Sequence, residues 1–161
     1  MTRMLTSLVA LLAVVVVAFA GLGWWSSRTA PAAAGLVNGR LAACDAAPHC
    51  VCSDAGERDD ALHWVDAIAL PVLADDTRWR VIREVLAASG GAVEREQANY
   101  LHATYTSRLL RFVDDVELRI DGAQLHIRST SRVGYSDLGA NRRRVEDLRA
   151  RLMVALAGVK S

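Results

Sequence analysis

Side chains able to bind an anion recur between residues 102 and 141 of the chain. Arginine presents a planar guanidinium that matches carboxylate or phosphate groups, and histidines and hydroxyl groups stand between the arginines. An exposed sheet face is usually polar, so a solvated face of cross-strand ion pairs is the alternative to a binding surface. The residues that we predict as ligand-binding are His102, Arg108, Arg128, Arg132, Asp137 and Asn141. They indicate a site for a small anionic ligand or a protein partner.

The segment SRVGYSDLGANRRR, residues 131–144, connects a predicted strand to a predicted helix. Gly134 and Gly139 permit tight turns, and Ser136, Asp137 or Asn141 can cap the helix. The free N–H groups of a helix start can also receive an anion. The segment therefore predicts a structural turn that also organises a small anion-accepting surface, whereas a cap followed by solvated arginines is the alternative.

Established catalytic signatures are absent from the sequence. It contains neither a Gly-x-Ser-x-Gly elbow nor a Gly-x4-Gly-Lys-Ser/Thr phosphate loop. A hydrolase that uses histidine with aspartate or serine at the rim of the sheet is the alternative to a binding module, and the side chains available to it are Ser107, Ser129, Ser131, His102, His126, Asp114 and Asp115. We predict a binding module rather than an enzyme, and no cofactor.

The N-terminal segment is separate in composition from the rest of the chain. Residues 8–25 include no charged residue and end in Trp24 and Trp25. They predict either a cleaved signal peptide, with Ala18 and Ala20 at an A-x-A site, or an uncleaved transmembrane anchor. We favour the anchor because the apolar run continues past the cleavage site. The expected organisation is a membrane helix at 1–25, a flexible tether at 26–43 and an extracytoplasmic (periplasmic) domain at 44–161.

The charge of the domain excludes one class of partner. Residues 1–43 hold three arginines and no acid, whereas the rest of the chain holds 16 basic and 18 acidic residues. A domain with this balance has no overall attraction for a phosphate backbone. We therefore expect no nucleic-acid binding.

All three cysteines lie within nine residues, in CDAAPHCVC. Outside the cytoplasm conditions are oxidising, so Cys44 and Cys50 predict a small disulfide loop that leaves Cys52 as a free thiol. A zinc or copper site with His49 or His63, or a redox role for the three cysteines, is the alternative. No Cys-x-x-Cys pair supports it, and we predict no metal site.

The hydrophobic pattern predicts an α+β domain. A helix is expected from about residue 75 to Gly90, and a second one with the buried stripe Val145, Leu148, Leu152 and Leu156. Strands are expected near residues 62–70, 92–97, 99–108, 112–120 and 123–132, with a hairpin at Asp121-Gly122. The predicted fold is an antiparallel sheet of about four to five strands with two helices on one face, preceded by the transmembrane helix. The other face, with His102, Asp115, Glu117, Arg128 and Arg132, is expected to be uncovered.

Three segments together resemble a known family. They are CDAAPHCVCSD, YLHATYTSRLLRFVDDVELRID and IRSTSRVGYSDLGANRRRVEDLR, which span residues 44–149. This pattern resembles the family called domain of unknown function 1499, whose members often follow an export or membrane segment. The resemblance implies location and architecture and no activity. The family has a serine where Cys52 stands, which supports the pairing of Cys44 with Cys50.

Overall fold

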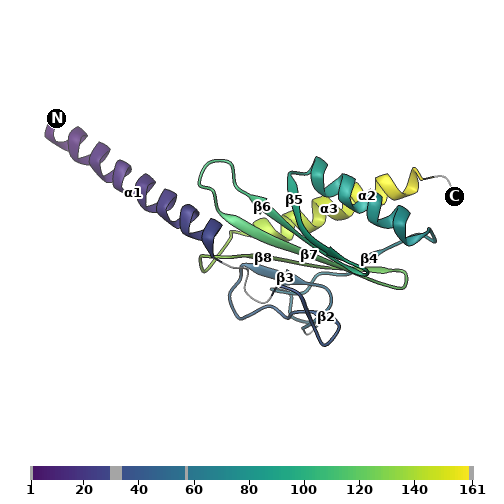
Figure 1. Ribbon diagram of the computed structural model, residues 1–161. Coiled ribbons are helices and arrows are strands. Elements are labelled where there is room, and N and C mark those ends of the chain that lie inside the picture. The colour runs from purple at the N-terminus through teal and green to yellow at the C-terminus, as the bar shows by residue number, and fades with distance from the viewer. Residues whose placement is uncertain (1, 30–33, 57, 160–161) are drawn as a thin grey trace.

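The computed structural model describes residues 2–29, 34–56 and 58–159, which form helices and strands in an α+β arrangement (Figure 1). In chain order these elements are α1 (Thr2–Arg28), β1 (Leu36–Val37), β2 (Arg40–Leu41), β3 (Cys50–Cys52), β4 (Ile68–Ala69), α2 (Asp75–Ala88), β5 (Gly91–Gln97), β6 (Tyr100–Thr106), β7 (Val113–Asp121), β8 (Gln124–Ser131) and α3 (Ala140–Ala157). The α+β class predicted from the sequence is confirmed.

The main sheet has six strands, one more than the upper limit of our prediction. β3, β8, β7, β6 and β5 lie in that order, and β4 also pairs with β8. All of these pairs are antiparallel. β3 and β4 have three and two residues, which is too short for an alternating pattern to show. Within residues 62–70, where one strand was expected, Ile68–Ala69 is the strand that pairs with β8, and Trp64 forms an isolated bridge with Cys52 of β3.

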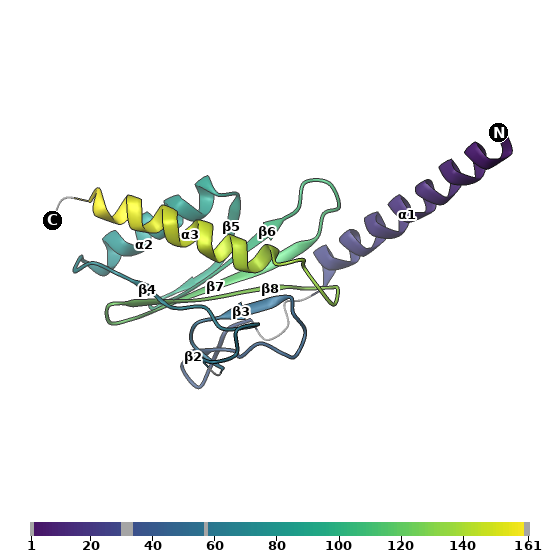
Figure 2. The same ribbon diagram turned by 180° about the vertical axis from the view of Figure 1, so that it is seen from behind.

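The apolar core lies between the sheet and the two helices that follow β4. Figures 1 and 2 show α2 and α3 side by side on one face of the sheet. Both helices contribute buried side chains to one cluster with alternate residues of β6, β7 and β8, among them Trp79, Ile82, Leu148, Leu152, Leu101, Ala103, Val116, Leu118, Leu125 and Ile127. The period-2 pattern therefore assigned the core-facing residues of these three strands correctly.

The opposite face of the sheet is covered, which contradicts our expectation that it would be open. The described residues between 34 and 64 form β1, β2, β3 and their connections. β3 is the strand beside β8 at the edge of the sheet, and the rest of this segment, with β1 and β2, lies across the face (Figure 1). We call it the covering segment. Leu41 packs on Tyr100 and Cys52 in a second, small apolar cluster. Residues 36–42 had been predicted as part of a flexible tether, whereas here they pair and pack on the domain.

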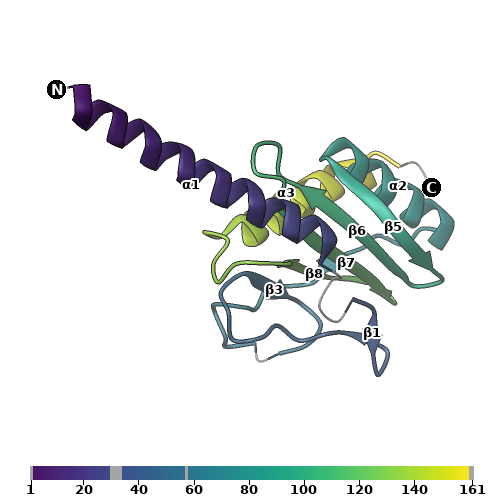
Figure 3. The same ribbon diagram turned by 60° about the vertical axis from the view of Figure 1, so that its left-hand side comes forward.

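The helix α1 extends away from the domain and contacts it only near its C-terminal end (Figures 1 and 3). It is the one helix among the described residues that is long and apolar enough to cross a membrane, a property that signal sequences share. Its last turns are fixed by the hydroxyl of Ser26. The backbone N–H of Val113 donates to Ser26 Oγ at 2.9 Å, and Ser26 Oγ donates to the Val113 carbonyl at 3.4 Å.

Candidate functional site

The polar face of the sheet is a buried layer of paired charges. The residues that form this buried polar layer are His102, Thr104, Asp115, Glu117, Arg119, Arg128 and Thr130, each less than one-tenth exposed. Alternation along β6, β7 and β8 places them on one face, as predicted. They are not solvated, because the covering segment lies over them. Their burial is possible because the charges are paired, Glu117 with Arg128 in the layer and Arg119 with Asp54 of the covering segment.

Glu117 is at the centre of the buried polar layer. Its carboxylate accepts hydrogen bonds from Tyr100 Oη at 2.6 Å, Arg128 Nη1 at 2.8 Å and the backbone N–H of Gly35 at 2.7 Å. Burial, together with the bond to this carboxylate, raises the pKa of Tyr100. Arg128 was predicted as a ligand-binding residue, but its guanidinium is buried and its charge is neutralised by Glu117.

Asp54 connects the covering segment to the sheet. Arg119 donates to its two oxygens from Nε at 2.7 Å and Nη2 at 2.8 Å, and the N–H of Leu41 donates at 2.8 Å. Burial by itself raises the pKa of this carboxyl group, but the hydrogen bonds from Arg119, Leu41 and Arg40 outweigh burial and lower the pKa to about 2. Asp54 is therefore a carboxylate at physiological pH.

Asp115 connects the sheet to the end of α1. Arg132 donates to both of its oxygens at 2.9 Å, and His102 Nε2 lies 2.7 Å from Asp115 Oδ1. Burial opposes ionisation of Asp115, yet the bonds with His102 and Arg132 lower its pKa. Arg132 Nη1 also donates to the carbonyl of Thr29 at 3.0 Å. Two further predicted ligand-binding residues, His102 and Arg132, are thus engaged within the protein.

The remaining predicted residues lie outside the buried polar layer. Arg108 is exposed in the loop between β6 and β7. The carboxylate of Asp137 accepts hydrogen bonds from the backbone N–H groups of Gly139 at 2.9 Å and Asn141 at 2.6 Å. It therefore supplies acceptors for N–H groups at the start of α3, which have no partner within the helix. Asn141 is buried, and its amide donates to the His49 carbonyl and to Ser131 Oγ. The six residues therefore do not form one site.

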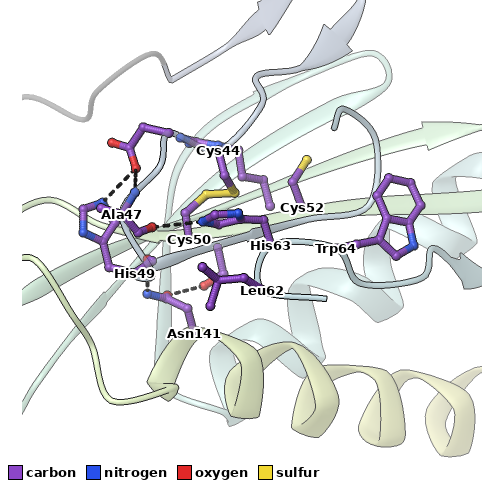
Figure 4. Close-up of a disulfide and its surroundings, with 12 residues drawn as sticks. Cys44, Ala47, His49, Cys50, Cys52, Leu62, His63, Trp64 and Asn141 are labelled. Carbon is purple, nitrogen blue, oxygen red and sulfur yellow. Dashed lines mark hydrogen bonds and ion pairs between the residues drawn. A yellow bond between two sulfur atoms is a disulfide. The ribbon is translucent and has the colours of Figure 1, made fainter. Parts of the chain in front are cut away.

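Asp137 and Asn141 line a pocket of about 260 Å³ that we call the α3 pocket. It lies between the start of α3 and the disulfide loop. Its lining residues are Pro48, Cys50, Val51, Leu62, Ser136, Asp137, Leu138, Gly139, Asn141 and Arg142. The wall contributed by Cys50 is held by the Cys44–Cys50 disulfide, and Figure 4 shows Leu62 and Asn141 beside that bond.

A protein-family model described as "Protein of unknown function (DUF1499)" matches residues 40–152, more than half of the chain. The chain belongs to this family. The matched region begins with β2 and ends within α3, so it includes the sheet, the buried polar layer and the α3 pocket, whereas α1 precedes it. No curated protein matches the chain.

The cysteines of this family member are arranged as the sequence predicted. Cys44 and Cys50 form a disulfide, and Cys52 is a free, buried thiol. Burial raises the pKa of Cys52, which keeps its sulfur in the poorly reactive thiol form. Among the described residues, no group of three or more histidine, cysteine or acidic side chains is placed to hold a metal ion.

Among the side chains considered for a hydrolase, His102 bonds to Asp115, but the serines bond elsewhere. Ser107 Oγ accepts from the Phe112 N–H, and Ser129 and Ser131 both bond to Asn141. Each histidine bonds to a carbonyl or carboxylate oxygen instead, namely His49 to Gly134, His63 to Asp60 and Ala47, His102 to Asp115, and His126 to Ser53. Within the described part of the chain, no serine hydroxyl bonds to a histidine ring.

Sequence reasoning missed most of the α3 pocket. From the sequence, Arg142 was considered only as a solvated arginine, in the alternative for this segment, whereas its Nη2 donates to the carbonyls of Ala61, Leu62 and Trp64 at 3.0–3.1 Å. Pro48, Val51 and Leu62 come from a segment that is distant in sequence from α3. Only the contact between the two segments reveals the pocket, and no local pattern in either one indicates it.

Proposed function

We propose that the protein is a membrane-anchored extracytoplasmic binding module whose ligand site is the α3 pocket. The observation that carries this proposal is the pocket itself, where Asp137 and Asn141 meet Ser136 and Arg142 beside a wall fixed by a disulfide. Ligand sites are typically concave and largely apolar, with a few polar groups in fixed positions. The buried polar layer, by contrast, is occupied by its own ion pairs and by the covering segment.

The lining of the α3 pocket favours a small ligand with an anionic group and an apolar part. Arg142 supplies positive charge, and its position is fixed by the backbone carbonyls that it binds. Ser136 Oγ accepts the Leu138 N–H, so its hydroxyl proton remains for a ligand oxygen. The carboxylate of Asp137 is already satisfied by N–H groups of the helix start. Pro48, Val51, Leu62 and Leu138 supply apolar contact area.

Two features support an extracytoplasmic domain. Arg3 precedes the apolar run, and positive charge favours the cytoplasmic side. The Cys44–Cys50 disulfide is typical of oxidising compartments. On this proposal the N-terminus lies inside the cell and the domain lies on the periplasmic side.

The thiol content of the protein in its own cells tests the side of the membrane. We expect alkylation under denaturing conditions, after an acid quench, to modify one cysteine before reduction and three after it, as read by mass. Cys52 would be the single site because the other two sulfurs are bonded to each other. Three modified cysteines before reduction would contradict the extracytoplasmic placement.

Blocking the α3 pocket tests the ligand site. Leu62 lines the pocket, so Leu62→Trp should fill part of its volume. We expect full-length protein, taken from its own membrane into detergent, to carry a small bound molecule in native mass spectrometry. Leu62→Trp should lose at least nine-tenths of that adduct.

The matched control is Val72→Trp. Val72 is also an exposed apolar loop residue, 93% exposed, and it does not line the pocket. This variant should keep the adduct at the wild-type level. Equal adducts in the two variants, or a wild-type protein that carries none, would count against a ligand site in the α3 pocket.

A further inference from the structure

The loop between β6 and β7, residues 107–112, lies against the end of α1. Gly23 is buried there, and a Cβ atom at this position would overlap the carbonyl of Leu110. Close contact between the two backbones thus requires glycine. Ser26 fixes the next turn of the helix to Val113, directly after the loop. The depth of this loop in a membrane is therefore set by the depth of Gly23.

The length of α1 determines that depth. A bilayer core of about 30 Å is crossed by about 20 helical residues at 1.5 Å each, and residues 4–23 provide that length without a charge. Trp24 and Trp25 then lie in the interface, where tryptophan is enriched. Since Leu110 touches Gly23, residues 107–112 lie at the boundary between the headgroups and the hydrocarbon.

The composition of the loop suits this position. Leu109 is 88% exposed, and Arg108 and Arg111 on either side of it are exposed as well. An apolar side chain can enter the lipid there while flanking arginines remain at the level of the phosphates. The loop contains no acidic residue, so no charge within it opposes anionic headgroups.

A second loop, residues 133–139, lies at the same end of the domain. Figure 3 shows the two loops on either side of α1. Tyr135 and Leu138 are 77% and 85% exposed. The preceding residue, Arg132, binds the Thr29 carbonyl at the end of α1, which holds the beginning of this loop close to the anchor.

We propose that these two loops are a lipid-binding surface, with Leu109, Tyr135 and Leu138 in the headgroup layer and Arg108 and Arg111 on the phosphates of anionic lipids. The proposal rests on membrane anchoring by α1, which is part of the proposed function. The second loop shares Leu138 with the α3 pocket, whereas Leu109, Arg108 and Arg111 of the first loop do not line that pocket. It gives the domain one orientation on the bilayer in place of free rotation about a tether.

Nitroxide probes on the full-length protein in lipid vesicles test this surface. Leu109→Cys and Val72→Cys attach the probe to exposed apolar residues at the α1 end and in the loop before α2, and Val14→Cys attaches it within α1. The parent chain controls for labelling of the buried Cys52. Relaxation by oxygen, which concentrates in lipid, is compared with relaxation by a water-soluble nickel chelate.

In vesicles of phosphatidylcholine with phosphatidylglycerol we expect at least a threefold higher oxygen-to-nickel ratio at Leu109→Cys than at Val72→Cys. Equal ratios at these two sites, with Val14→Cys in lipid, would overturn the lipid-binding surface and leave the anchor intact. A Val14→Cys probe in water would instead overturn the anchoring itself.

A separate comparison tests the contribution of the two arginines to lipid binding. Adding Arg108→Gln and Arg111→Gln to Leu109→Cys should lower the ratio in these anionic vesicles and leave it unchanged in pure phosphatidylcholine. If the ratio in anionic vesicles does not change, the assignment of the two arginines to lipid phosphates is wrong.

Discussion

Asp54→Ala should lower the free energy of unfolding by about 3–5 kcal/mol, the range for breaking a buried ion pair from one side. The substitution leaves the guanidinium of Arg119 buried without the carboxylate that accepts two of its N–H groups. It also leaves the N–H of Leu41 without its acceptor, so a bond within the covering segment is lost as well.

Denaturant unfolding of the full-length protein in detergent, followed by circular dichroism, measures this loss. Asp147→Ala is the matched control, because Asp147 also pairs with an arginine, Arg151, but both side chains are about half exposed. Exposed pairs contribute about 0–1 kcal/mol. Equal losses for the two variants would mean that the buried pair adds nothing beyond a surface pair.

The same comparison has a defined pH dependence. The pKa of Asp54 is about 2 in the folded protein and about 3.8 without its partners, so the unfolded state binds more protons between these values. The stabilisation from Asp54 is therefore complete above about pH 5 and is lost as the pH falls through 2. We expect the difference between wild type and Asp54→Ala to be largest near neutral pH and to shrink towards pH 2.

Arg132→Ala should also destabilise the domain by about 3–5 kcal/mol. Asp115 would lose both bonds from the guanidinium and keep only His102, and Thr29 at the end of α1 would lose its donor. Arg132 was predicted from the sequence to bind a ligand, and replacing an arginine in that role would change stability little. Its pairing with the buried Asp115 leads to the opposite expectation.

Thermal unfolding and limited proteolysis of the Arg132→Ala protein check this result. Arg80→Ala is the control, since Arg80 is an exposed arginine of α2 in a surface pair with Glu84. It should change the stability by no more than about 0.5 kcal/mol. If Arg132→Ala is as stable as the control, Arg132 does not stabilise the fold. It would then be a candidate ligand-binding residue again.

The faces of the central strands could be predicted from the sequence, whereas their exposure could not. Alternation in β6, β7 and β8 separates core residues such as Leu118 from polar ones such as Glu117, and the structure has the same separation. The pattern says which side chains share a face, but it contains no information on what covers that face. The cover comes from residues 34–64, whose strands of two or three residues have no recognisable period.

In the candidate site, the residue beside the start of α3 could be predicted from local sequence, whereas the residue with distant partners could not. Asp137 lies close in sequence to the helix start, so local rules named it, with Ser136 and Asn141, as a candidate acceptor for those N–H groups, and the structure has Asp137 in that role. The role of Asn141 could not be predicted, because its partners His49 and Ser129 come from separate elements. Polar side chains give no sequence signal of burial when the groups that satisfy them are distant in the chain.

The packing of residues 36–42 on the domain would limit how far the protein acts from a bilayer, if α1 is the anchor that we propose. A flexible linker of 18 residues would let a domain range over roughly 23 Å, as a random coil of that length does. Here the end of α1 is bonded to Val113 and Arg132, so a domain anchored by α1 would stay beside the membrane. It would extend from the membrane only by its own height. A ligand or partner would then have to come to the membrane surface, where the search for it takes place in two dimensions.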